Sequence, residues 1–159
     1  MAARAERAGS RARVAALLLL AGLAVPAGEH LYWALGGTWG LDRSVDGAIE
    51  ESTTTGIRVV AAVVVVLLVA AALVVLARAG LWRQPLVPDS VVRALAWGLA
   101  GFFLFHALVS FAEGWAGSLD EWWLYGPGGL VIGLLALVVA GSGGAWHMRG
   151  PRRKHGGGS

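Results

Sequence analysis

The stretch VVAAVVVVLLVAAALVV, from Val59 to Val75, has no polar side chain. A helix that crosses a bilayer needs about 20 mainly apolar residues, each rising 1.5 Å. The apolar run from Ile57 to Ala77 around this stretch meets that need, with Arg58 as its one charged residue. The sequence therefore predicts a membrane-spanning helix over about 57–77.

The composition of the whole chain agrees with a membrane protein. Its 159 residues are 57% hydrophobic and 14% charged, whereas soluble domains carry about 25% charged residues. The chain has no cysteine, which excludes disulfides, thiolate metal sites and cysteine nucleophiles. The pI is near 10.2, but the basic residues lie in flanks and tails and form no basic face, so we expect no nucleic-acid partner. The expected partner is the lipid bilayer.

Three further segments complete a predicted all-α, four-helix transmembrane bundle with short loops. The fourth segment has a short apolar centre, Leu130–Ala140, and reaches spanning length only with Pro127 at its first helical position. The membrane domain covers 14–146, between a basic tail at 1–13 and a basic, Gly-rich tail at 147–159 that is expected to be disordered. The predicted spans are about 14–35, 57–77, 91–112 and 127–146.

Basic residues gather on one side of these spans. Lysine and arginine are retained in cytoplasmic loops, and this bias orients membrane helices. Eleven of the thirteen basic residues lie in the two tails or between the second and third spans, and only Arg43 and Arg58 lie opposite. Both termini are therefore expected in the cytoplasm.

The first span also fits a second interpretation. The segment RARVAALLLLAGLAVPAGEH, residues 11–30, has the basic start, apolar core and V-P-A pattern of a cleavable secretory signal. Cleavage after Ala27 would leave three helices. Apolar character resumes over Leu31–Leu35, so we favour an uncleaved span. Cleavage of residues 1–27 stays open, as does whether the terminal GGGS is native.

The first span closes with HLYWALGGTWG, from His30 to Gly40. This run resembles the H-x-Y-W-A-x-G-G-x-x-G signature of a family of small bacterial integral membrane proteins, domain of unknown function 3995. The family's late D-x-x-x-Y-x-P pattern would correspond to Asp120 or Glu121, with Tyr125 and Pro127. The resemblance covers about residues 17–139 and implies a multi-pass protein of the bacterial inner membrane, with no agreed activity. Family members tend to carry an arginine in the third helix, where this chain has His106.

Aromatic residues cluster at the predicted outer boundary. Tyrosine and tryptophan rings have an apolar body and a hydrogen-bonding tip, which suits the headgroup layer of a bilayer. The sequence therefore predicts an aromatic belt formed by Tyr32, Trp33, Trp39, Trp115, Trp122, Trp123 and Tyr125.

A second group of side chains is ionisable or polar and lies at a similar depth. His106, Ser110 and Glu113 follow i, i+4, i+7 spacing and form a polar stripe on the third span. Unpaired polar groups in hydrocarbon cost several kcal/mol each, so the stripe is expected to face the bundle interior. Its expected partners are Glu29, His30 and Arg58.

The sequence leaves three interpretations of this polar cluster open. In the favoured one, these groups hydrogen-bond to one another and hold the helices together in a non-enzymatic accessory or structural protein. In the second, the cluster binds a ligand or handles protons in a small transporter, with the two histidines titrating. In the third, it holds haem or quinone. No catalytic residue, metal ligand or cofactor is assigned, and a homo-oligomer or an unidentified membrane partner stays open.

Overall fold

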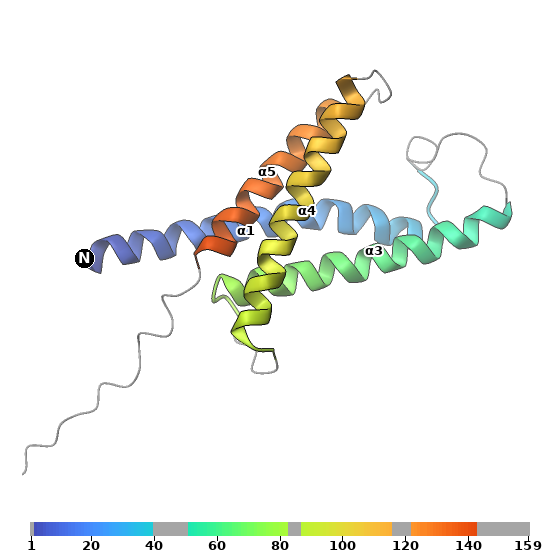
Figure 1. Cartoon of the computed structure of the whole chain (residues 1–159). Helices are drawn as coiled ribbons and strands as arrows, with labels where there is room; N and C mark the ends of the chain where they lie inside the picture. Colours follow the sequence, from blue (N-terminus) through green and yellow to red (C-terminus); the bar gives the residue numbers. More distant parts are fainter. Residues whose placement is uncertain (1, 40–50, 83–86, 116–121, 143–159) are drawn as a thin grey trace, which may run out of the picture.

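The computed structural model describes residues 2–39, 51–82, 87–115 and 122–142, and every regular element in these ranges is a helix. The helices are α1 (Ala2–Ala34), α3 (Glu51–Arg78), α4 (Asp89–Trp115) and α5 (Trp122–Gly141) (Figure 1). The predicted all-α, four-helix fold is confirmed. Three helices contain stretches long and apolar enough to cross a membrane: Gly9–Ala34, Thr55–Arg78 and Asp89–Ala112.

The helices form two antiparallel hairpins that cross each other. Helix α1 packs along α3, and α4 packs along α5, while any two helices from different hairpins contact each other less (Figure 1). We call the end of the bundle where α3 ends, α4 begins and α5 ends the Arg78 end. The opposite end, where α1 and α4 end, is the Trp39 end.

The shared hydrophobic core lies toward the Arg78 end. It contains Leu19 and Leu23 of α1, Val75 of α3 and Val139 of α5, all almost completely buried. The other buried members of this core are alanines: Ala15, Ala16, Ala79, Ala100 and Ala136. Because alanine side chains are small, they let the four helix backbones approach closely where the hairpins cross.

Glycines hold α4 and α5 in close contact. A Cβ atom on Gly129 would lie 3.3 Å from the Cβ of Ala107, and one on Gly133 would lie 2.7 Å from Leu104 Cδ2. Gly129 and Gly133, which are spaced as in a G-x-x-x-G motif, therefore face α4 of the same chain. Gly22 of α1 likewise allows close contact between the two hairpins, since a Cβ there would lie 3.4 Å from Ile132 of α5.

The boundaries of two helices differ from the predicted ones. α1 begins at Ala2, so the predicted basic tail is a continuation of the first helix. α5 begins at Trp122, which places Pro127 inside the helix and not at its first position. Pro127 lacks only the donor that would bond to the Trp123 carbonyl, so the helix loses one bond near its start. Its apolar part, Gly126–Gly141, is shorter than the three candidate spans, and residues 143–146 lie outside the described residues.

We expect Gly133→Ala to destabilise the α4/α5 hairpin. The added methyl would also lie 2.9 Å from Leu104 Cγ and 3.1 Å from the Leu104 backbone nitrogen, so the helices must separate. Overpacking of this kind costs about 1–3 kcal/mol. The matched control is Gly128→Ala in the same helix, where nothing lies within 4 Å of the new Cβ. Unfolding in mixed detergent micelles measures both, and equal stability of the two variants would contradict the packing.

Candidate functional site

The glycine pair of the His30–Gly40 motif ends α1 in a Schellman turn. The backbone N–H of Gly37 donates to the Tyr32 carbonyl at 2.9 Å, and that of Gly36 donates to the Trp33 carbonyl at 3.0 Å. Gly36 has φ +99°, a conformation that L side chains rarely adopt. The Tyr32 ring lies so close over Gly37 that a Cβ there would overlap it. Both glycines are therefore required by the shape of this turn.

Trp33, a member of the predicted aromatic belt, lies inside the protein. Its side chain is buried, and it packs with Ala34 of α1 and with Ile57 and Ala61 of α3. Its indole Nε1 donates to the Trp39 carbonyl at 3.0 Å. One side chain thus joins the end of α1 to the start of α3 and holds the turn that follows α1.

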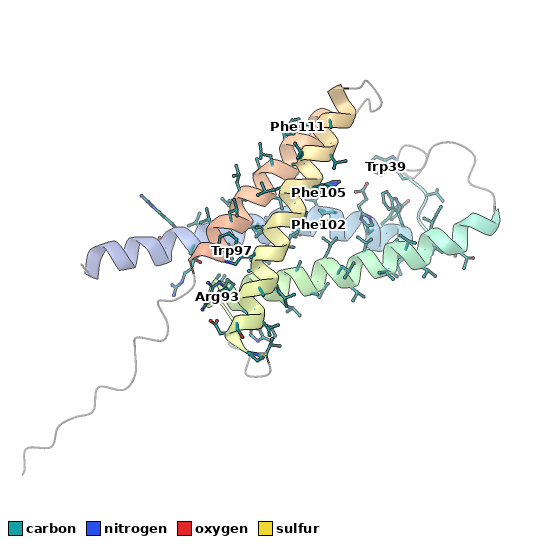
Figure 2. The ribbon with its side chains drawn as sticks, in the orientation of Figure 1. Trp39, Arg93, Trp97, Phe102, Phe105 and Phe111 are labelled. Atoms are coloured by element: carbon teal, nitrogen blue, oxygen red, sulfur yellow. The ribbon has the colours of Figure 1, made fainter. Side chains whose placement is uncertain are left out.

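Two other members of the predicted belt have described side chains. Tyr32 and Trp39 are exposed, and Trp39 lies at the end of the described part of the α1 segment (Figure 2). Their place at a membrane boundary stays a prediction. The side chains of Trp115, Trp122, Trp123 and Tyr125 lie outside the described residues.

His30 is half-buried one turn before Trp33. Its Nδ1 lies 2.8 Å from the Pro26 carbonyl oxygen, and its ring centroid lies 4.9 Å from that of Trp33. Since a carbonyl can only accept, we assign the proton to Nδ1. In the neutral ring this leaves Nε2 as an acceptor. The histidine is oriented by α1 itself and by Trp33.

Arg58 of α3 extends across the end of α1. A Cβ on Gly36 would lie 2.9 Å from Arg58 Nη2, so the absence of a side chain at Gly36 makes room for the guanidinium. A cation at a helix C-terminus is favoured by the helix dipole and by the unbonded carbonyls of the last turn. Arg58 therefore contacts the signature turn directly, although it is exposed to solvent or headgroups.

The remaining residues of the predicted polar cluster are dispersed along the two hairpins. Glu29 is exposed and makes no hydrogen bond or ion pair with another described side chain, whereas Ser110 is buried. His106 is also exposed, and its ring stacks on Phe102 with centroids 6.3 Å apart and planes 5° apart. Phe102 and Phe105 lie midway along α4 (Figure 2). The side chain of Glu113 lies outside the described ones, and the shared site stays a prediction.

A different polar site, which the sequence did not reveal, joins three helix ends around Arg78. The Arg78 side chain is only 5% exposed. Its Nε and Nη2 donate to the Ala140 carbonyl at 3.3 and 3.0 Å, and its Nη1 lies 3.8 Å from Asp89 Oδ1. Arg93 Nη2 binds the other oxygen of Asp89 at 3.1 Å. We call Arg78, Asp89, Arg93 and Ala140 the Arg78 junction.

The helix ends at the Arg78 junction stabilise the charges of Arg78 and Asp89. Arg78 lies in the last turn of α3 and Asp89 in the first turn of α4, the ends at which the helix dipole stabilises a cation and an anion respectively. The Ala140 carbonyl belongs to the last turn of α5 and has no donor in its own helix. From the sequence, Arg78 was only one of the basic residues that indicate orientation. Its neighbours Ala77 and Ala79 were the one weak signal that another helix could approach it.

The described side chains form no metal site. No three histidine, aspartate or glutamate side chains among the described residues are grouped closely enough to hold a metal ion. The buried nitrogen and oxygen atoms of these side chains all have a hydrogen-bond partner. The buried polar groups of this part of the chain therefore bind other protein atoms.

Comparison with known proteins gives a match to one family. A family model described as "Protein of unknown function (DUF3995)" matches residues 23–136, which run from the second half of α1 to Ala136 in α5. No curated protein matches. No solved structure matches either.

We expect Gly36→Ala to weaken the join between α1 and α3. Holding alanine at φ +99° and displacing the Arg58 guanidinium would cost about 1–2 kcal/mol. Gly28→Ala is the control, because Gly28 lies in the same helix with nothing within 4 Å of the added methyl, and alanine favours helix by up to about 1 kcal/mol. The two variants should shift the thermal unfolding midpoint in opposite directions; a shift in the same direction would contradict the structural role of Gly36.

Proposed function

Because the chain belongs to the DUF3995 family of proteins of unknown function, we propose a function from its bundle: a multi-pass protein of the bacterial inner membrane that acts as a non-enzymatic accessory or structural component. Three of its helices are long and apolar enough to cross a membrane. These spans bury few of their residues, and in the span of α3 only 11% of the most apolar 18-residue stretch is buried. Lipid or another membrane protein must cover that surface.

The observation that carries the accessory role is the use of the polar groups. Trp33 binds the Trp39 carbonyl, His30 binds the Pro26 carbonyl, and Arg78 binds the Ala140 carbonyl. Each of these groups, which elsewhere could bind a substrate, is committed to a helix end or a helix turn of this chain. The signature motif and the Arg78 junction are therefore best explained as contacts that hold the apolar helices in their arrangement.

The proposed orientation places both termini in the cytoplasm. It is supported by the eleven basic residues on one side of the spans, which include Arg78 and Arg93 of the Arg78 junction. In this orientation the Arg78 end faces the cytoplasm, and the signature turn with Trp39 faces outward.

Single cysteines test this orientation, because the chain has none of its own. We expect Thr38→Cys, at the end of α1, to react in intact cells with a membrane-impermeant maleimide. Ser90→Cys, in the first turn of α4, should react only after the membrane is permeabilised. Both residues are exposed, so access depends on the side of the membrane. Labelling of Ser90→Cys alone in intact cells would reverse the proposed orientation.

A second candidate function is a small transporter or proton-linked ligand-binding protein. It is favoured by Glu29 and His106, which are ionisable, exposed and without a hydrogen-bond or ion-pair partner among the described side chains. Ionisable groups within membrane helices commonly mark proton or substrate pathways.

Proton flux distinguishes the two functions. We expect proteoliposomes that contain the chain and an enclosed pH-sensitive dye to acidify no faster than protein-free vesicles after an acid jump. The matched controls are Glu29→Gln and His106→Gln, which keep size and polarity but remove the titrating group. Acidification above that of the protein-free vesicles, and lost in these variants, would support the transporter and overturn the accessory role.

A further inference from the structure

Each hairpin is tied together along its own length. In the α4/α5 hairpin, Gly126, Gly129 and Gly133 face Phe111, Ala107 and Leu104, so close packing continues from the start of α5 to its middle. In the α1/α3 hairpin, Trp33 packs on Ile57 and Ala61 near the Trp39 end. The shared core with Leu19 and Val75 joins the same two helices near the Arg78 end. Each hairpin therefore has internal contacts toward both of its ends.

Contacts between the two hairpins are concentrated toward the Arg78 end. The shared core joins Leu19 and Leu23 of one hairpin to Ala136 and Val139 of the other. Arg78 supplies two hydrogen bonds and an ion pair that cross from one hairpin to the other at this end. Figure 1 shows the two hairpins apart at the Trp39 end, with the start of α3 far from the end of α4.

Glu29 and His106 lie further toward the Trp39 end than the residues by which the hairpins meet. On α1, Gly22 contacts Ile132 of the other hairpin, and Glu29 lies seven residues, or two turns, further along the same face. On α4, Phe103 packs against the shared core, and His106 lies one turn further along. Both side chains are exposed and unpartnered by hydrogen bond or ion pair among the described residues.

A carboxylate and an imidazole can hydrogen-bond to each other within a membrane. An ionisable side chain within a membrane helix is costly unless it meets water or a partner of opposite character. Glutamate accepts hydrogen bonds, and histidine donates one or two. One such group stands on each hairpin.

We propose that the two hairpins move as units about the Arg78 junction, and that closing them at the Trp39 end pairs Glu29 with His106. The Arg78 guanidinium suits a pivot because it binds the ends of α4 and α5 from the end of α3, and so keeps the two hairpins joined at this end. In the open arrangement both ionisable groups are accessible. In the closed one they bind each other. This inference stands apart from the accessory role.

Distance measurements between spin labels test the proposal. Labels at Thr38→Cys and Ala112→Cys, both exposed sites near the Trp39 end, report the separation of α1 from α4 in lipid nanodiscs. We expect two distance populations, open and closed. Glu29→Leu and His106→Leu should each lower the ratio of closed to open by roughly three- to twentyfold, as for the loss of one polar contact between membrane helices.

The controls separate hinge motion from damage to the fold. The double variant Glu29→Leu with His106→Leu should lower the ratio no further than either single change, because the first substitution already removes the pair. Labels at Thr38→Cys and Thr55→Cys, within one hairpin, should give a single distance in every background. Arg78→Met should broaden the distance between the hairpins, and Arg78→Lys should broaden it less. A single inter-hairpin distance, unchanged by the leucine substitutions, would overturn the proposal.

Discussion

A permanently charged guanidinium inside an apolar bundle sets the arrangement of this fold. Burying a charge without partners is far more costly than any packing gain around it. Arg78 is nearly inaccessible, and three of its atoms reach acceptors on α4 and α5. The end of α3 can therefore lie only where a free helix carbonyl and a carboxylate meet. This requirement joins the two hairpins at the Arg78 end, where their other contacts are apolar and weakly directional.

The signature motif provides the polar contacts at the Trp39 end, where α1 ends. A helix that ends near a membrane surface must satisfy its last carbonyls and turn the chain. The left-handed Gly36 forms the turn, the Tyr32 ring covers Gly37, and Trp33 holds both the turn and α3. His30 belongs to the same unit through its contact with Trp33. The motif is thus accounted for by structure, and among the cluster members with described side chains, Glu29 and His106 are the ionisable groups that this account does not use.

The proposed function depends on what meets the exposed surface of the helices. A bundle with small alanine-lined contacts and long exposed valine and leucine faces has its interaction capacity on the outside. Such a protein suits an accessory role in which lipid or a membrane partner covers the apolar faces. The pairing proposed for Glu29 and His106 adds a conformational change to this accessory role. It needs only two hairpins that are joined at one end.

The sequence by itself determined the helical class and the apolar spans, because these follow from length and hydropathy. It also identified the His30–Gly40 motif and its family. It could not place Trp33 inside the protein or Arg78 at a three-helix junction, since the partners, Ala61 and Ala140, lie 28 and 62 residues away. Only the tertiary structure decided these contacts. The role of a buried side chain depends on the residues that it contacts, and the crossing of the hairpins determines which residues these are.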